Sequence, residues 1–216
     1  MAAEKTRKTD RRTLYTKMAI KDSLLALLHG SSFDKLTVTA VCRQAEVTRA
    51  TFYLHYDDLT SVLDELLDDA LKLAEAEGRR PDEDMFEMLQ LAAGRRRCKT
   101  VQHRYDCLLP VCQRVADAEK YRVLFLDESL SAHIVKRLFD VERDIMVPLL
   151  KEGCGLTGAE AEKLFQFVIC GCFSVNKSMG WQKDEGWYDV QDVLVRFILG
   201  GVDALKAAGA PASERR

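Results

Sequence analysis

Apolar residues recur three and four positions apart along most of the chain, which is the spacing of one face of an α-helix. The first segment with this pattern predicts a helix over residues 13–29, ended by Gly30-Ser31-Ser32. Its apolar face consists of Ile20, Leu24, Leu27 and Leu28. Residues 1–12 are polar and basic, and we expect them to form a mobile arm.

Two shorter patterns follow and predict helices over residues 38–45 and 49–56, with Glu46-Val47-Thr48 as the turn between them. Thr37 and Thr48 stand where a hydroxyl oxygen can accept hydrogen bonds from the free N–H groups at a helix start. The side chains expected on the inside are Val38, Val41, Cys42, Ala45, Val47, Ala50 and Phe52.

A fourth and longer helix is predicted over residues 58–77, with Asp58 as its N-cap. Its inner side chains are expected to be Leu59, Val62, Leu63, Leu66, Leu67, Ala70 and Leu73. Further helices are predicted over residues 83–94, 105–118, 120–126, 129–151, 157–180 and 188–208. Thr157 and Glu160 match a capping box, and Pro148 should kink the helix that contains it. The expected fold class is therefore all-α.

The composition excludes several classes of protein. Of the 216 residues, 47% are hydrophobic and 31% charged, which is typical of a globular chain with a sizeable core. No stretch approaches the roughly 20 apolar residues of a membrane span. The N-terminus lacks the apolar core of a signal peptide, so we expect a cytoplasmic protein with no membrane partner. The seven cysteines include no CxxC pair and are expected to be reduced thiols.

The net charge of −2 conceals an asymmetry between the two parts of the chain. Residues 1–56 contain ten Lys and Arg against five Asp and Glu, a net charge of +5, while residues 57–216 carry −7. A basic N-terminal quarter on an acidic remainder indicates a polyanion-binding unit attached to a different kind of domain.

Two short helices joined by a tight turn match a helix-turn-helix, whose second helix lies in the major groove of DNA, about 12 Å wide. The outer face of the predicted second helix carries Arg49, Thr51, Tyr53 and His55. These side chains offer a cation, hydroxyl groups and an imidazole to phosphates and base edges. The other interpretation is a short core helix whose polar residues face water, since such helix pairs are common in all-α proteins.

The segment VTRATFYLHY, Val47 to Tyr56, resembles the turn and recognition helix of the TetR family of bacterial transcriptional regulators. The resemblance extends over about residues 13–70 through Ile20, Leu24, Leu27, Leu28, Phe33, Leu36, Thr37, Val38, Val41, Cys42 and Ala45. It implies an all-α fold with an N-terminal three-helix DNA-binding head and a larger helical body that binds a ligand and dimerises. We therefore expect an arm and DNA-binding domain over residues 1–57, a linking helix over 58–78 and a regulatory domain over 79–216.

The same resemblance implies which residues contact DNA, namely Thr37, Thr39, Thr48, Arg49, Thr51, Tyr53 and His55. This chain departs from the family at Ala50, where Gly is usual, and at Leu59, where a Lys often contacts a phosphate. The preceding Asp57-Asp58 pair would oppose DNA binding. The arm either reaches phosphates or the minor groove or stays solvated, and its basic residues are Lys5, Arg7, Lys8, Arg11 and Arg12.

The two last predicted helices are unusually apolar. In the helix over residues 157–180, one face is apolar and a second face carries the small residues Gly171, Val175 and Ser178, so this helix needs two partners. The TetR resemblance implies that both helices form a homodimer interface, and the residues expected there are Phe165, Ile169, Val193, Leu194, Phe197 and Ile198. The alternative is a central helix buried in a monomer.

A small-molecule effector site in the body is implied only by the resemblance. The candidate wall residues are Tyr105, Cys112, Tyr121, Phe125, Met146, Phe173, Asn176 and Trp181, and each is more readily explained as plain core. Asn176 is polar on a largely apolar helix and therefore needs a hydrogen-bond partner, which a cap, a second subunit or a ligand could supply.

Other functions are weighed against this interpretation. Cys98, His103, Cys107 and Cys112 lie within fifteen residues, which leaves a metal or thiol sensor open as an alternative, although their spacing does not place all four on one helix face. The chain contains none of the nucleotide, zinc-protease or serine-hydrolase motifs, so we expect no enzyme and no cofactor. The sequence thus predicts a homodimeric, ligand-responsive repressor that binds a palindromic operator in double-stranded DNA. An activator acting through a protein partner is the nearest alternative.

Overall fold

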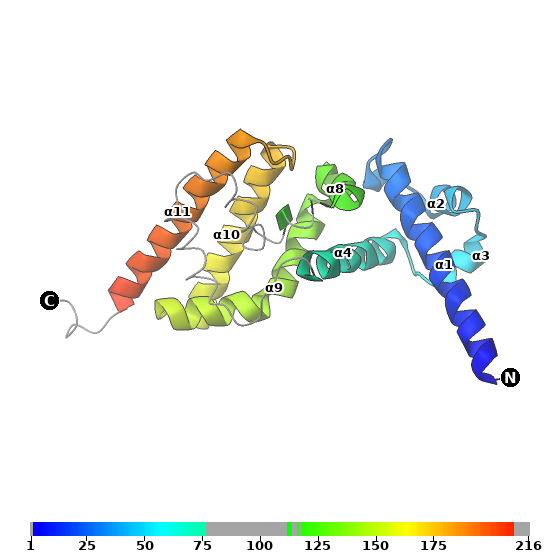
Figure 1. Ribbon diagram of the computed structural model, residues 1–216, viewed down its shortest axis with the longest axis horizontal. Helices are drawn as coiled ribbons and strands as arrows, with labels where there is room; N and C mark the ends of the chain where they lie inside the picture. The colour runs from blue at the N-terminus through cyan, green and yellow to red at the C-terminus, as the bar shows by residue number, and fades with distance from the viewer. Residues whose placement is uncertain (1, 77–111, 114–115, 117, 210–216) are drawn as a thin grey trace.

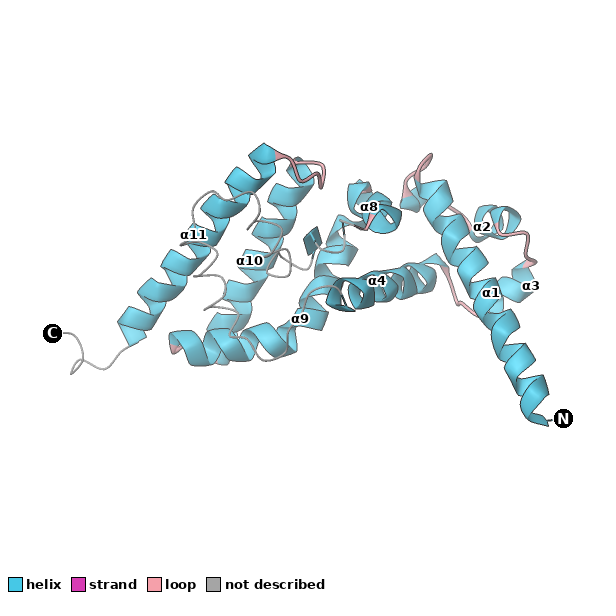
Figure 2. Cartoon of the chain, viewed as in Figure 1, coloured by secondary structure: helices cyan, strands magenta, loops and turns pink. Residues whose placement is uncertain are grey.

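The computed structural model describes residues 2–76, 112–113, 116 and 118–209. Within these residues every regular element is a helix and there is no strand (Figure 2), which confirms the all-α prediction. The predicted helix over 83–94 and most of that over 105–118 lie outside the described residues.

The N-terminal unit, called the head below, consists of α1 (Ala2–Leu28), the short 3-10 helix η1 (Phe33–Lys35), α2 (Val38–Gln44) and α3 (Arg49–Tyr53). Its core is built from residues of all three α-helices, and the side chains of Ile20, Leu24, Val41 and Phe52 are fully buried. Packing these faces together removes apolar surface from water and fixes α2 and α3 against α1.

The helix α4 (Leu59–Ala76) lies between the head and the rest of the chain (Figure 1). The remaining elements, called the body below, are α8 (Glu119–Leu126), η3 (Glu128–Leu130), α9 (Ser131–Cys154), α10 (Gly158–Ser178) and α11 (Glu185–Gly209). In the body, α10 packs against both α9 and α11, and α11 also contacts α9. The helix α9 runs without interruption through Pro148.

The predicted caps are confirmed. Thr37 and Thr48 each accept a hydrogen bond from the backbone N–H three residues later, at 3.2 and 3.0 Å. Asp58 accepts from the backbone N–H of Ser61 at 2.7 Å, and Thr157 and Glu160 form a complete capping box. Caps are set by local sequence, which is why single residues were enough to locate these helix starts.

Three local predictions were wrong. The first helix begins at Ala2 and not at residue 13, because residues 2–12 contain no Gly or Pro and are rich in helix formers that extend an already anchored helix. Ala50 is exposed, since it lies two positions from the buried Phe52 and so faces the other side of α3. Leu73 is 42% exposed, because α4 is covered only as far as Leu71 in its described part.

Candidate nucleic-acid interface

The turn between α2 and α3 is short and tightly bonded. Val47 donates its N–H to the carbonyl oxygen of Cys42 at 3.0 Å, and Glu46 takes a left-handed backbone conformation with φ of 54°. Thr48 then returns to an extended conformation and caps α3. This sequence of conformations lets α2 support α3 from directly behind, as in a helix-turn-helix.

The inner side of α3 is fixed by one aromatic residue. Phe52 is fully buried, and its ring lies 5.8 Å from the ring of Tyr56 between centroids. The edge of the Tyr53 ring meets Phe52 at 5.4 Å and 86°, a favourable arrangement for aromatic pairs. A helix of five residues has little stability of its own, so this packing holds α3 in place.

The outer side of α3 presents Arg49 and Tyr53 together. Tyr53 is 49% exposed, Arg49 is exposed, and the Arg49 guanidinium lies 5.9 Å from the centre of the Tyr53 ring. This contact limits the rotamers of both side chains while leaving their hydrogen-bond donors on the surface. Thr37, Thr39 and Thr48 are also exposed, whereas Thr51 and His55 are half-buried. All seven residues lie in the α2–turn–α3 segment or within two residues of its ends.

Two of the candidate threonines are already engaged. The Thr37 hydroxyl caps α2, and the Thr48 hydroxyl caps α3 and lies 2.9 Å from the Thr51 hydroxyl. Their oxygens therefore hold the ends of the helices, and any contact with DNA would use only the remaining donor capacity. Arg49, with five N–H donors, has the largest hydrogen-bonding capacity of the set, and Tyr53 adds an exposed hydroxyl.

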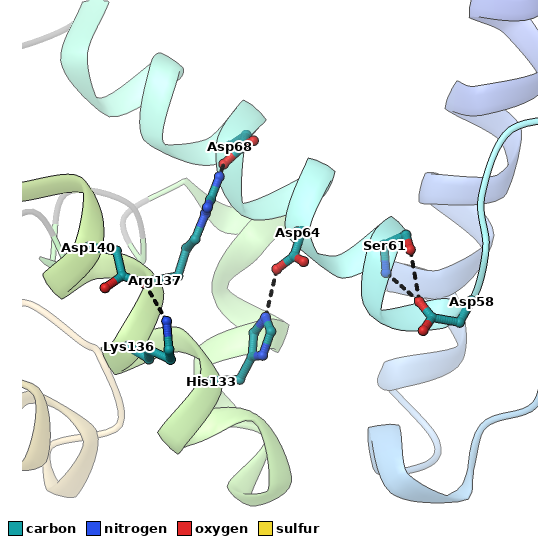
Figure 3. A network of polar contacts seen from close by, with 8 residues as sticks. All are labelled: Asp58, Ser61, Asp64, Asp68, His133, Lys136, Arg137 and Asp140. Atoms are coloured by element: carbon teal, nitrogen blue, oxygen red, sulfur yellow. Dashed lines mark hydrogen bonds and ion pairs between the residues drawn. The ribbon is translucent and has the colours of Figure 1, made fainter.

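Asp58, which looked unfavourable near DNA, has a structural role. Its carboxylate accepts hydrogen bonds from the backbone N–H and the hydroxyl of Ser61, at 2.7 and 2.9 Å, at the start of α4 (Figure 3). The bond from the Ser61 backbone is the main reason that the pKa of Asp58 lies below its ordinary value of 3.8. Leu59, at the position of the family's lysine, is buried in the core.

The helix α4 is bonded to the head on one side. Lys17 and Lys21 on α1 form ion pairs with Glu65 at 2.5 and 3.1 Å, and Lys21 also pairs with Asp69. Burial works to lower the pKa of Lys21, but its hydrogen bonds to Asp69 and Glu65 outweigh burial and raise that pKa. Burial likewise works to raise the pKa of Glu65, and the bonds from the two lysines lower it overall. The head and α4 are thus joined by charges.

A neighbouring side of α4 is bonded to the body. His133 Nε2 lies 2.7 Å from Asp64 Oδ1, and Arg137 forms an ion pair with Asp68 (Figure 3). Because α4 bridges α1 and α9 in this way, a displacement of α9 has a direct polar path to the head.

We did not predict this network from the sequence, although a signal for it exists. The two basic residues on α1 are four positions apart, and so are the two on α9. Each of these pairs contacts two acidic residues on α4, which are likewise four positions apart. The residues involved are Lys17, Lys21, Asp64, Glu65, Asp68, Asp69, His133 and Arg137. Charges at this spacing share a helix face, so complementary pairs on different helices indicate a contact.

The candidate effector residues lie in the core of the body. Phe125, Phe173 and Trp181 contact one another with ring centroids 5.0–6.2 Å apart, and Trp181 donates its Nε1–H to the carbonyl oxygen of Phe125 at 3.1 Å. Cys112, Tyr121 and Asn176 are buried, and Met146 is half-buried. Tyr105 lies outside the described residues.

Asn176 has the partners that its burial requires. Its Oδ1 accepts hydrogen bonds from Trp187 Nε1 at 2.7 Å and Gln191 Nε2 at 3.0 Å, and its Nδ2 donates to the carbonyl oxygen of Cys172 at 2.9 Å. The side chain therefore ties α10 to α11 within one chain.

The candidate dimer residues divide into two groups. Phe165 and Ile169 are 5% and 6% exposed in the core of the body, so these two side chains face inward and offer no surface to a partner. On α11, Val193 and Phe197 are 58% and 67% exposed, with Leu194 and Ile198 half-buried beside them. The outward face of α10 instead carries Phe167, which is 65% exposed and which we missed although it precedes Gly171 of the small-residue face by one helical turn.

The described cysteines test only part of the alternative function, a metal or thiol sensor. Cys98, His103 and Cys107 lie outside the described residues, and Cys112 is buried. Burial raises the pKa of the Cys172 thiol to about 11, and it also raises the pKa of Cys42 and Cys154, which keeps these thiols protonated near neutral pH. Within the described residues no cluster of three His, Cys, Asp or Glu side chains is arranged for a metal ion.

Comparison with known proteins gives one match. The chain is 26% identical over 133 residues to an uncharacterized HTH-type transcriptional regulator, YxbF, of Bacillus subtilis (strain 168). The match covers 58% of this chain and 34% of that protein, so the chain spans about a third of its length. No family model matches the chain, and no solved structure matches it. The similarity supports a transcription regulator of the helix-turn-helix class without singling out the TetR family.

In the part of the chain that the structure describes, no helix is both long enough and apolar enough to cross a lipid bilayer.

Proposed function

We propose that this protein is a DNA-binding transcription regulator of the TetR type, a homodimeric repressor that reads a palindromic operator with α3. The observation that carries the proposal is the outer face of α3, where Arg49 and Tyr53 stand exposed and in mutual contact while Phe52 fixes the helix from behind. The similarity to a helix-turn-helix regulator points to the same class of function.

The chemistry of this face suits the major groove. An arginine can donate two parallel hydrogen bonds to a guanine edge or to a phosphate, and a tyrosine hydroxyl can donate to a phosphate oxygen. The net charge of +5 over residues 1–56 supplies the attraction to DNA that does not depend on sequence. Specificity would then come from Arg49 and Tyr53, with the threonines and His55 as neighbouring contacts.

The body has exposed apolar stripes on α10 and α11 that could pack against a second subunit. Exposed residues of α10 form a stripe at helical spacing, Phe167, Cys170, Gly171 and Ser174, and those of α11 form another, Val193, Phe197, Gly200, Gly201 and Ala204. Added Cβ atoms at Gly171, Gly200 and Gly201 would meet nothing within 4 Å, so backbone from another chain could approach closely. Large exposed aromatic rings beside small residues suit a twofold interface of helices.

A twofold dimer would also determine the operator. Two copies of α3 related by this symmetry would read half-sites in successive major grooves, about 34–36 Å apart. Repression would follow from occupancy of a site that overlaps a promoter.

Regulation by an effector would act through α4. This helix is bonded to α1 through Glu65 and to α9 through Asp64 and Asp68, so a ligand that prefers a different position of α9 would shift the head with it. The spacing of the two heads in the dimer would change, and operator affinity would fall.

The test is a selection of bound DNA from a random double-stranded pool with the full chain, followed by titration of the recovered site at two salt concentrations. We expect a palindromic site, a strong fall of affinity with salt, and a loss of specific affinity in Arg49→Ala that is absent in Arg43→Ala, an exposed arginine on the neighbouring α2. Binding without any recovered sequence preference would contradict the proposal, as would an equal loss in the two variants.

A further inference from the structure

The head contacts the body at a second place, at the opposite end of α1 from its N-terminus. The N–H of Phe33, the first residue of η1, donates to Oδ2 of Asp127 at 2.7 Å. Asp127 lies between α8 and η3, and its Oδ1 accepts from the backbone N–H and the hydroxyl of Ser129 at 2.8 and 2.7 Å. One carboxylate therefore caps η3 of the body and holds a loop of the head.

The segment that carries Asp127 is fixed within the body. Just before it, the carbonyl oxygen of Phe125 accepts from the buried Trp181, and just after it Leu130 is buried in the core. Trp181 has a left-handed backbone conformation with φ of 56°, and it is fully buried, so the surrounding packing holds it there. The position of Asp127 is thus fixed by the packing of the body, so a bond to Asp127 can fix the position of the head.

Among the described residues, one other polar contact at this position is an ion pair. Lys120 pairs with Asp22 at 2.9 Å, but both side chains are more than half exposed, and such pairs contribute little. The helices α1 and α8 pack against each other there (Figure 1). The bond from Phe33 to Asp127 is also charge-assisted, but its donor is a backbone N–H, whose position depends on the loop and not on a flexible side chain.

We infer that Asp127 is a latch that fixes the orientation of the head against the body independently of α4. A unit held at one point can turn about it in any direction, whereas a second, separated attachment restricts it to rotation about the line that joins the two points. The ion pairs of α4 are one polar attachment, and the Asp127–Phe33 bond, beside the packing of α1 against α8, is another. Any effect of the latch on operator affinity rests on the proposed function. Its effect on the orientation of the head does not depend on DNA binding.

The experiment measures the distance between head and body without DNA. Spin labels are introduced as non-natural amino acids at Gln44 on α2 and Glu152 on α9, which are exposed, so that the seven native cysteines stay in place. Phe33→Pro removes the ring and the N–H donor, while Phe33→Ala removes the ring and keeps the donor. Ser32 is already extended, with ψ of 152°, so proline fits at the next position.

We expect a wider distribution of label distances in Phe33→Pro than in Phe33→Ala. Asp127→Ala should widen the distribution in the same way, whereas Ser129→Ala, which leaves the carboxylate and its bond to Phe33, should not. The double variant Phe33→Pro with Asp127→Ala should be no wider than either single variant, because both break one bond. Circular dichroism checks that each variant is folded. If a Phe33 variant does not fold, the comparison of Asp127→Ala with Ser129→Ala decides, and the reverse holds if one of those two does not fold.

Equal distributions in Phe33→Pro and Phe33→Ala, or in Asp127→Ala and Ser129→Ala, would overturn the latch. Failure to recover an operator would leave these measurements untouched, so the latch and the proposed function can fail separately.

Discussion

The outward surfaces of the head and the body differ in kind. On α3 of the head the exposed aromatic residue is Tyr53, paired with Arg49, and both present polar groups to the surroundings. On α10 and α11 of the body the exposed aromatic residues are Phe167 and Phe197, each at least 65% exposed and beside small residues. Both surfaces leave large side chains in water, which costs free energy unless a partner covers them.

The difference teaches what kind of partner each surface fits. A surface that keeps donors and positive charge at its tip can exchange water for phosphates and base edges. A surface dominated by phenylalanine and glycine offers few donors and gains mainly by excluding water against another apolar face. The surface of the head is therefore suited to a nucleic acid, and that of the body to an apolar partner, which we propose to be a second copy of the chain.

The largest expected effect tests the body. Phe197→Glu should destabilise the dimer by about 3–6 kcal/mol, because a twofold interface loses the burial of the ring twice. Sedimentation at a series of concentrations measures this, and Ile145→Glu on α9, also exposed and apolar, is the matched control. A dimer of unchanged strength in Phe197→Glu would place the interface elsewhere.

The next effect tests the head. Arg49→Ala and Tyr53→Ala should each weaken binding to the selected operator by roughly 1–3 kcal/mol. The melting temperature should change little, since both side chains are exposed at the surface of α3. Fluorescence anisotropy measures the affinity, and wild-type affinity in both variants would mean that another helix reads the DNA.

A smaller effect tests how the head is attached to α4 and depends on pH. The pKa of Glu65 is lowered from 4.5, so its stabilisation is present above that pH and is lost as the pH falls through the lowered value. The pKa of Lys21 is raised from 10.5, so its stabilisation is present below that pH and is lost as the pH rises through the raised value.

Glu65→Gln should therefore cost about 1 kcal/mol of unfolding free energy near neutral pH and make the decline in acid shallower. Denaturant unfolding at several pH values measures both. Asp140→Asn, which breaks the exposed pair with Lys136 on α9, should change neither. Parallel acid declines in wild type and Glu65→Gln would show that this carboxylate does not join the two elements.

The smallest effect is expected from replacing two N-cap aspartates, one beside the proposed DNA surface and one in the body. Asp58 caps α4 beside the proposed DNA surface, and Asp184 accepts from the Trp187 N–H at 2.8 Å at the start of α11 in the body. Asparagine caps as well as aspartate, so Asp58→Asn and Asp184→Asn should each change stability by less than about 0.5 kcal/mol. Only Asp58→Asn should raise operator affinity, by about 0.5 kcal/mol at low salt, because it removes a negative charge near phosphates. Equal affinities in the two variants would mean that Asp58 lies away from bound DNA.

Prediction from the sequence succeeded where local rules decide. The caps at Thr37, Thr48, Asp58 and Thr157 were found because a side-chain oxygen and the N–H three residues later lie in one short segment. The all-α class followed from a helical spacing repeated along the whole chain.

Prediction was weaker where several helices share a surface. Phe165 and Phe167 are both apolar residues of α10, and periodicity alone did not show that the first is buried and the second exposed. The orientation of α10 against α9 and α11 decides this, and that orientation depends on contacts between distant segments.

The sequence by itself determined the helices, their caps, the basic charge of the first quarter and the chemistry that Arg49 and Tyr53 can offer, because each depends on neighbouring residues. Only the tertiary structure decided that α4 is held between Lys21 and Arg137, that Asp127 reaches Phe33 across 94 positions, and that Asn176 is satisfied within its own chain. These contacts join residues far apart in the sequence, and their formation depends on how whole helices pack.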